Sequence, residues 1–139
     1  MRIAVASGKG GTGKTTVSTN LAVVMSEKYD RVQYIDCDVE EPNGHLFLRP
    51  DIEESLDVEV LVPAVDETKC IHCGKCSKLC RFNAIACLAG RTLVFPELCH
   101  GCGGCVRICP VGAITETGRA IGVIETGRAR GIQFVHGML

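Results

Sequence analysis

The chain has 139 residues, about the length of one ordinary domain, and 46% of them are hydrophobic. Its net charge is −1 and only 4% of its residues are aromatic, which argues against nucleic-acid binding by a basic surface or by base stacking. No apolar segment approaches the ~20 residues of a membrane helix, and the stretch before Gly8 is too short for a signal peptide. We therefore expect a cytoplasmic protein with no membrane insertion and no nucleic-acid partner.

The first 60 residues have the pattern of an α/β fold. The short apolar run 2–7 predicts a buried parallel strand, and Val32 to Ile35 predicts a second one. Between them, a helix is expected from Thr15 to about Lys28. Its sheet-facing side is predicted from helical spacing to carry Val17, Leu21, Val24 and Met25. Together these form one β-α-β unit of a doubly wound parallel sheet.

A glycine-rich loop joins the first predicted strand to the helix. It has the phosphate-binding spacing G-x-x-x-x-G-K-[ST], met by Gly8, Gly13, Lys14 and Thr15. Glycines let backbone N–H groups turn toward phosphate oxygens, and the following helix adds its positive N-terminal end. Lys14 is expected to reach the β- and γ-phosphates of ATP, and Thr15 to bind Mg²⁺. The alternative is an incidental glycine-rich turn.

Two carboxylates, Asp36 and Asp38, follow the second predicted strand. The carboxyl end of a parallel strand is where α/β proteins collect their ligands, so these groups could hold Mg²⁺ through water or orient an attacking water. A solvated acidic turn is the alternative. Cys37, between them, is interpreted as a small filler and not as a ligand.

The loop and the Asp-x-Asp pattern resemble the MinD/Mrp/nitrogenase-iron-protein group of ATPases, which have a deviant Walker A motif. The resemblance implies a homodimer of the complete protein in which Lys9 reaches the partner's nucleotide, although Lys9 alone reads as a solvated loop lysine. It implies catalytic roles for Lys9, Lys14 and Asp38. The implied nucleotide-binding residues are Gly8, Lys9, Gly10, Gly11, Thr12, Gly13, Lys14, Thr15, Thr16, Asp36 and Asp38.

The chain contains ten cysteines, and eight of them form two runs offset by 29 residues. Without an export signal, such runs indicate metal or redox chemistry in preference to disulfides. Gly74, Ala84 and Ile85 in the first run match Gly103, Ala113 and Ile114 in the second. The runs are Cys70-x₂-Cys73-x₂-Cys76-x₃-Cys80 and Cys99-x₂-Cys102-x₂-Cys105-x₃-Cys109-Pro110.

These runs are similar to the bacterial ferredoxin pattern for two [4Fe–4S] clusters, in which the fourth cysteine of each run ligates the other cluster. The resemblance implies one cluster on Cys70, Cys73, Cys76 and Cys109, and another on Cys99, Cys102, Cys105 and Cys80. Each fourth cysteine is expected at the start of a short helix. Zinc is the chemical rival, although zinc sites usually show separated cysteine pairs.

Several residues near the runs are interpreted as structural. Cys87 is expected in the core, while His72 and His100 are expected to face solvent or to form hydrogen bonds. Arg81 stands where the second run has Pro110, which is expected to loosen one turn and to tune the neighbouring cluster. The alternating stretch Asp57–Val60 predicts a half-exposed strand leading into this region.

After residue 117 the segments 121–125 and 132–136 predict a β-hairpin joined by residues 126–131, with His136 in a structural role. No Asp-x-x-Gly segment follows, so relative to the family the chain is expected to be an N-terminal, truncated portion with an incomplete P-loop domain. The predicted domains are 1–60 (P-loop), 61–117 (inserted α+β ferredoxin-like) and 118–139 (return hairpin).

Two functions are compatible with these motifs. The first is an ATP-binding iron–sulfur protein that couples ATP binding or hydrolysis to electron transfer, with ATP, Mg²⁺ and two [4Fe–4S] clusters as cofactors and a redox protein as partner. The second is a non-enzymatic electron carrier or cluster carrier whose nucleotide site is vestigial.

Overall fold

The computed structural model describes all residues from Met1 to Leu139, and the chain divides into two compact units. The first unit comprises Met1–Val58 and Gly122–Leu139, and the second comprises Glu59–Ile121. The long strands β2 and β5 contribute residues to both units. No helix combines the length and the apolar character that spanning a membrane requires.

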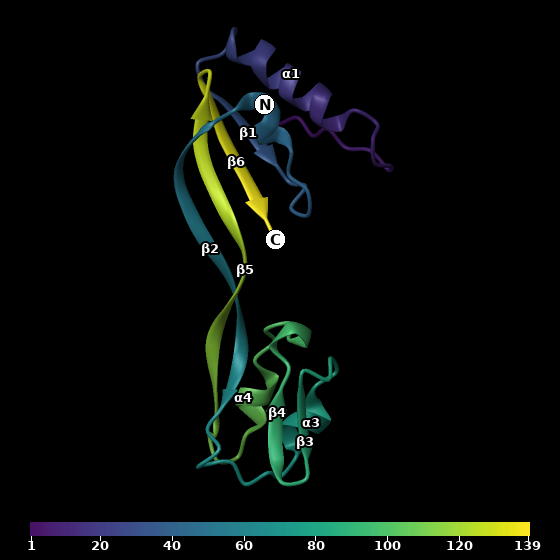
Figure 1. The fold of residues 1–139 in the computed structure, drawn as a ribbon, viewed down its shortest axis with the longest axis vertical. Coiled ribbons are helices and arrows are strands. Elements are labelled where there is room, and N and C mark those ends of the chain that lie inside the picture. The colour runs from purple at the N-terminus through teal and green to yellow at the C-terminus, as the bar shows by residue number, and fades with distance from the viewer. The chain divides into compact units, whose positions relative to one another are not determined.

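The first unit is an α/β arrangement built on the strand order β1-β6-β5-β2 (Figure 1). β1 pairs with β6 in parallel, and β6 pairs with β5 in the antiparallel direction. The bounds are α1 Lys14–Ser26, β1 Val32–Asp36, α2 Gly44–Leu48, β2 Asp51–Val65, β5 Ile114–Ala129 and β6 Ile132–Met138.

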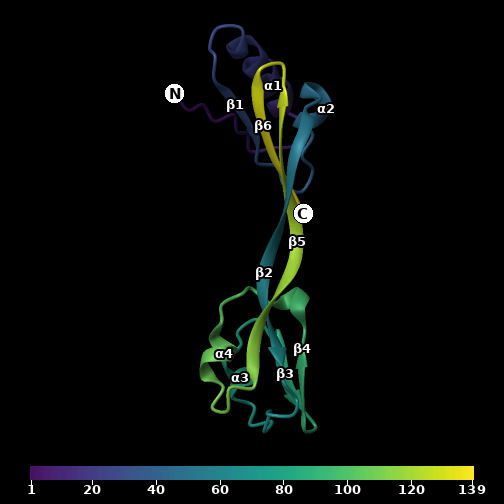
Figure 2. The same cartoon turned by 90° about the vertical axis from the view of Figure 1, so that its left-hand side faces the viewer.

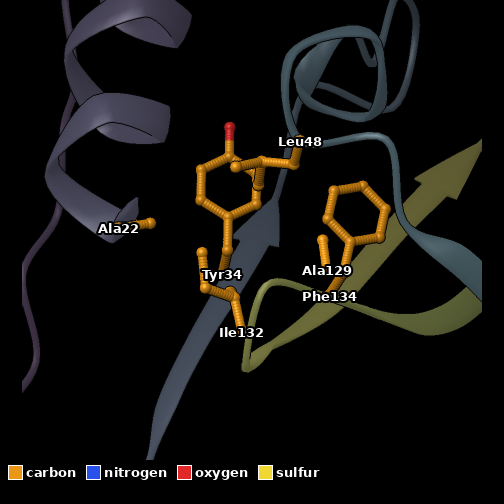
Figure 3. Close-up of a cluster of buried hydrophobic side chains, with 6 residues drawn as sticks. All are labelled: Ala22, Tyr34, Leu48, Ala129, Ile132 and Phe134. Atoms are coloured by element: carbon orange, nitrogen blue, oxygen red, sulfur yellow. The ribbon is translucent and has the colours of Figure 1, made fainter. Parts of the chain in front are cut away.

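The core of this unit lies where α1 and α2 cover the β1–β6 pair. Tyr34 of β1 and Phe134 of β6 are register partners, and their rings stack with centroids 5.8 Å apart. Phe134 and Ile132 are completely buried. Figure 3 shows the six side chains of this cluster, which are Ala22, Tyr34, Leu48, Ala129, Ile132 and Phe134.

The predicted strand at 2–7 is wrong, because this segment has no regular structure and Ile3 is 54% exposed. The parallel partner of β1 is β6, from the other end of the sequence. Without a paired neighbour, an apolar run of this length neither satisfies its backbone groups nor covers its side chains. The expected β-α-β unit is therefore replaced by a pairing between distant segments.

The predicted buried face of the helix is only partly correct, because just two of its four residues, Leu21 and Met25, are half-buried. Thr19 and Ala22 of α1 are buried, whereas Val17 and Val24 are 57% and 48% exposed. The second half of this helix is apolar on most sides, so spacing alone does not select a face. Thr19 can be buried because its hydroxyl donates to the carbonyl oxygen of Thr15 at 2.7 Å.

The second predicted strand exists as β1, but it is half-buried and not fully buried as expected. Tyr34 lies in the core, while Ile35 is 56% exposed on the opposite face. α1 and α2 pack on the face that carries Tyr34, and Ile35 points to the opposite face because side chains alternate along a strand. The strand predicted at Asp57–Val60 is present within β2, with the expected alternation of exposed and partly buried residues.

The predicted hairpin is confirmed as β5–β6, with a tighter turn than expected. Only Arg130 and Gly131 form the turn, with φ angles of +49° and +80°. Two consecutive positive φ angles match a type I′ turn, whose twist suits flanking antiparallel strands. His136 is 3% exposed, and its Nε2 lies 2.9 Å from Oε2 of Glu125, its register partner on β5.

The second unit contains two short helices, each preceded by a glycine with positive φ, and a two-stranded antiparallel sheet (Figure 2). The matching pairs Ala84/Ala113 and Ile85/Ile114 are all buried, so the repeat in the sequence corresponds to a repeat in the core. The bounds are α3 Lys75–Leu79, β3 Ile85–Leu88, β4 Arg91–Val94, the 3₁₀ helix η1 Pro96–Leu98 and α4 Gly104–Ile108.

We predict that Phe134→Ala destabilises the first unit by roughly 3–5 kcal/mol, because it removes a fully buried ring and leaves a cavity. Urea unfolding followed by circular dichroism measures the loss. Phe47→Ala is the matched control, since Phe47 is 53% exposed. Equal effects of the two variants would contradict the assignment of the core.

Candidate functional site

The glycine-rich loop turns immediately before α1 and is closed by its own polar side chains. Thr12 Oγ1 donates to Ser7 Oγ at 2.8 Å, and Ser7 Oγ donates to the carbonyl oxygen of Lys9 at 2.8 Å. Gly13 is the N-terminal cap of α1 with φ +87°, a conformation that favours glycine. The loop therefore leads directly into the amino end of a helix, where anions are favoured.

The lysines and hydroxyls of the loop occupy different environments. Lys9 is exposed, whereas Lys14, the first residue of α1, is half-buried. The Thr15 hydroxyl donates to Oδ1 of Asn43 at 2.8 Å. Thr15, predicted to bind Mg²⁺, is thus joined to the segment that follows the acidic residues.

The acidic residues organise that segment. Asp36 Oδ2 accepts the backbone N–H of Gly44 at 2.8 Å, and its Oδ1 accepts that of Asp38 at 3.2 Å. The side chain of Asp38 is exposed. The structure therefore places Thr15 and Asp36 against two consecutive residues: Thr15 contacts Asn43, and Asp36 contacts Gly44.

Asn43 and Gly44 were missed by sequence reasoning. A Cβ at Gly44 would lie 2.7 Å from Tyr34 Cε1 and 2.8 Å from Asp36 Oδ2, so a larger residue would have to displace one of these side chains. The available signal was the Asn-Gly pair, a common turn dipeptide. Cys37 is exposed, which corrects its interpretation as a filler in the packing.

Five cysteines line a cavity of about 220 Å³ in the second unit. The N–H of Gly101 donates to Cys99 Sγ at 3.5 Å, and burial raises the pKa of Cys105 despite backbone hydrogen bonds to its sulfur. The wall of the cavity also includes Leu79, Arg81, Phe82 and His100. The cysteines are Cys80, Cys99, Cys102 and Cys105, which are expected to hold one cluster, together with Cys76, which also lines the other cavity.

A second cavity, of about 20 Å³, is lined by the thiols of Cys70, Cys73, Cys76 and Cys109. Cys109 Sγ accepts the N–H of Ala113 at 3.2 Å. Although burial opposes the change, this and neighbouring backbone N–H groups lower the pKa of Cys109, whereas burial raises the pKa of Cys76. The volume admits little more than one water molecule, so these thiols must separate to admit a larger group.

The fourth cysteine of each run was predicted at the start of a short helix, and this is wrong. Cys80 and Cys109 are the C-terminal caps of α3 and α4, whereas Cys76 and Cys105 lie within those helices. Glycines with positive φ, Gly74 and Gly103, begin each helix instead. Each fourth cysteine nevertheless lines the cavity of the other run.

No three His, Cys, Asp or Glu side chains converge closely enough to hold a single metal ion. A tetrahedral zinc site would place four ligand atoms within ~2.3 Å of one ion. The thiols instead stand around two cavities, and the larger one has room for a group of several atoms. The cysteine thiols around each cavity are the donors that an iron–sulfur cluster takes, and the smaller cavity must open to hold one.

His72 and His100 follow their predicted structural roles, whereas Cys87, expected in the core, is only partly buried and lies outside the hydrophobic clusters. His72 Nδ1 lies 3.2 Å from Thr92 Oγ1, and the ring of His100 lies against that of Phe82 with centroids 4.1 Å apart. Cys87 is partly buried in β3 and donates to the carbonyl oxygen of His72 at 3.3 Å.

Comparison with known proteins places the fold in a family. Residues 3–135 match the model of the CobQ/CobB/MinD/ParA nucleotide binding domain. The chain belongs to this family. The resemblance to MinD- and Mrp-type proteins is thereby confirmed, and with it the P-loop class of the α/β fold.

Three relatives illustrate the range of similarity. An uncharacterized protein of Methanocaldococcus jannaschii is 41% identical over 103 residues, which are 73% of this chain and 35% of the relative. An uncharacterized ATP-binding protein of the same organism is 50% identical over 46 residues, 33% of this chain and 17% of the relative. An iron–sulfur cluster carrier protein of Methanococcus maripaludis is 39% identical over 66 residues, 48% of this chain and 20% of the relative. The chain thus spans about a third or less of these relatives.

We predict that Gly101→Ala destabilises the second unit more than Gly90→Ala. Both glycines have positive φ, which costs alanine roughly 1–2 kcal/mol. Only at Gly101 would the added Cβ also lie 3.1 Å from Val60 Cγ1 and 3.3 Å from Leu61 O. Denaturant unfolding of the two variants gives the comparison, and equal losses would contradict the close approach at Gly101.

Proposed function

We propose that the chain forms part of an ATP-binding iron–sulfur protein in which ATP binding and hydrolysis are coupled to electron transfer through two [4Fe–4S] clusters. The observation that carries this proposal is the gathering of eight cysteines around two cavities, with Cys76 lining both, in a chain that also contains a phosphate-binding loop. Four thiolates can also hold a single zinc ion, but the C-x₂-C-x₂-C-x₃-C spacing of both runs is the ferredoxin pattern for clusters.

In the nucleotide site, the backbone N–H groups of the loop and the amino end of α1 would bind the phosphates of ATP. Lys14 would place its ammonium group against the β- and γ-phosphates, and the Thr15 hydroxyl would move from Asn43 to Mg²⁺. Asp36 holds the segment 38–44 in place, and exposed Asp38 is available to orient an attacking water.

In the cysteine sites, one set of thiolates would hold each cluster, with the fourth cysteine supplied by the other run. When bound, a [4Fe–4S] cluster supplies one-electron redox chemistry. The chain supplies backbone N–H donors to the sulfurs, as at Cys99 and Cys109, and an apolar wall around them. Cys73 and Cys102 are exposed, which offers each cluster a route to a redox protein partner.

The proposed association of two copies of the protein is based on Lys9. It is exposed in the loop, where an ammonium group is free to reach a nucleotide on a second copy of the protein. We propose that the complete protein is a homodimer and that Lys9 acts across its interface.

A cluster carrier is the second candidate, favoured by the relative named an iron–sulfur cluster carrier protein. In that case the clusters are delivered to an acceptor protein instead of exchanging electrons. Transfer of ⁵⁵Fe from the loaded chain to an apo-ferredoxin would favour the carrier. Reversible reduction with retention of iron, together with Mg²⁺-dependent ATP turnover, would favour the coupled electron-transfer protein.

We predict that Lys14→Ala weakens ATP binding by at least roughly tenfold, because a charge-assisted hydrogen bond to phosphate contributes about 1.5–3 kcal/mol. Titration with a fluorescent ATP analogue measures the dissociation constant. Lys28→Ala, an exposed lysine beyond α1, is the matched control and should bind as the wild type does. Unchanged binding by Lys14→Ala would refute the nucleotide site.

We predict that Cys73→Ser and Cys109→Ser damage one cluster, while Cys102→Ser and Cys80→Ser damage the other. Each variant should lose about half of the iron bound after anaerobic reconstitution, because one of two equal clusters is affected. Iron analysis and electron paramagnetic resonance (EPR) of the reduced protein report the amount and identity of the remaining cluster.

The pairing of variants tests the exchange of the fourth cysteines between runs. Cys37→Ser is the control, since this exposed thiol lies in the first unit. The Cys37→Ser variant should bind as much iron as the wild type. If Cys109→Ser instead resembled Cys102→Ser, each run would bind its own cluster and the assignment would be wrong.

A further inference from the structure

A threonine hydroxyl lies against one thiol of the smaller cavity. Thr92, on β4, is 7% exposed, and its Oγ1 lies 3.3 Å from Cys70 Sγ and 3.2 Å from His72 Nδ1. The same hydroxyl is 4.0 Å from Cys87 Sγ, its register partner on β3. Three polar groups of different residues thus converge on one buried hydroxyl.

The chemistry of a bound cysteine decides where the hydroxyl proton goes. A cysteine that ligates a metal does so as a thiolate, which accepts hydrogen bonds and has no proton to give. The Thr92 hydroxyl has a single proton, and hydrogen bonds to an ionised acceptor are stronger than neutral ones. We therefore assign the hydroxyl proton of Thr92 to Cys70 Sγ. His72 Nδ1, which lies 3.2 Å from Thr92 Oγ1, is also 3.6 Å from this sulfur.

Backbone hydrogen bonds hold the main chains of Thr92 and Cys70 beside the smaller cavity. Thr92 is held by the β3–β4 pairing, and the N–H of Cys70 donates to the carbonyl oxygen of Asp66 at 3.0 Å. Asp66 is itself held by the N–H and hydroxyl of Thr68, at 3.0 and 2.6 Å from its Oδ1. Both backbones are held, and a role for Thr92 requires that Cys70 Sγ stay within hydrogen-bond distance of Thr92 Oγ1 when the cavity opens.

The second run has no equivalent of this arrangement. At the repeat offset of 29 residues, Thr92 corresponds to Ile121, and His72 corresponds to Gly101. Cys99, the counterpart of Cys70, accepts the backbone N–H of Gly101 at 3.5 Å. A side-chain donor to the first cysteine is therefore present in only one half of the repeat.

We propose that Thr92 is a positioning residue whose hydroxyl donates a hydrogen bond to the Cys70 sulfur and selectively raises the reduction potential of the cluster held by Cys70, Cys73, Cys76 and Cys109. A donor to a ligand sulfur stabilises the reduced, more negative cluster, and such hydrogen bonds are among the factors that set cluster potentials. The proposal rests on the proposed function, because it requires that the thiols bind clusters. It makes the two halves of the repeat electrochemically unequal.

The test is an EPR-monitored redox titration of the reconstituted full chain. Thr92→Val removes the hydroxyl with little change in volume and suits a strand. It should lower one midpoint potential by about 59 mV, equivalent to a tenfold weaker reduction of that cluster in a one-electron step, and leave the other unchanged. Thr92→Ser keeps the donor and should restore the wild-type potential.

Matched variants separate tuning from packing. Thr115→Val, an exposed residue of β5, should change neither potential. Thr92→Ala removes the same hydroxyl without the added methyl group and should lower the same potential as Thr92→Val. In a Cys73→Ser background, which lacks the affected cluster, Thr92→Val should have no effect on the remaining one.

Three results would overturn the inference: unchanged potentials in both Thr92→Val and Thr92→Ala, an equal shift of both clusters, or a Thr92→Ser variant that behaves like Thr92→Val. These results leave the proposed function intact, since both clusters are then present. A wild-type chain that binds no cluster on reconstitution overturns both proposals, and iron analysis distinguishes this case.

Discussion

The parallel pairing of β1 with β6 is the constraint on which the first unit depends. It joins Val32 to Ile132 and Tyr34 to Phe134, so the unit closes only after nearly the whole sequence has been made. Closing a long loop costs only slightly more than closing a short one, because the entropic cost rises with the logarithm of loop length. The stacked, buried pair of Tyr34 and Phe134 offsets that cost. The same pairing fixes Asp36 at the end of β1, and Asp36 in turn holds Gly44, next to Asn43, the partner of Thr15.

Features encoded by neighbouring residues could be predicted from the sequence. The phosphate loop, the β5–β6 hairpin and the cysteine repeat each depend on a short spacing rule, and the repeat reappears in the buried pairs Ala84/Ala113 and Ile85/Ile114. Features that depend on pairing between distant segments of the chain could not be predicted from the sequence. The run 2–7 is as apolar as a strand but finds no partner, and the apolar second half of α1 has more than one face that could be buried. In both cases the local sequence pattern is compatible with several tertiary environments, and the packing of distant segments determines which residues are buried.

The candidate sites show the same division. The two sets of thiols were expected from the resemblance to ferredoxins, and the structure gathers the same residues around two cavities. The position of Cys80 and Cys109 at helix ends was not expected, because the spacing gives their distance along the chain and not the end of the helix. Asn43 and Thr92 were missed for a related reason. Asn43 contacts Thr15, which is 28 residues away, and Thr92 contacts Cys70, which is 22 residues away. No sequence motif connects residues at such separations.

The two halves of the cysteine repeat share their backbone and differ in their side chains. Gly74 and Gly103 adopt the same positive φ before matching helices, so backbone geometry around the thiols is repeated. Side-chain donors are not repeated, since Thr92 and His72 have Ile121 and Gly101 at the corresponding positions. A duplicated fold begins with two equal sites, and substitutions outside the ligand positions can then make them unequal without disturbing either core. Two sites of unequal potential define a preferred direction for an electron between them, which two identical sites cannot do.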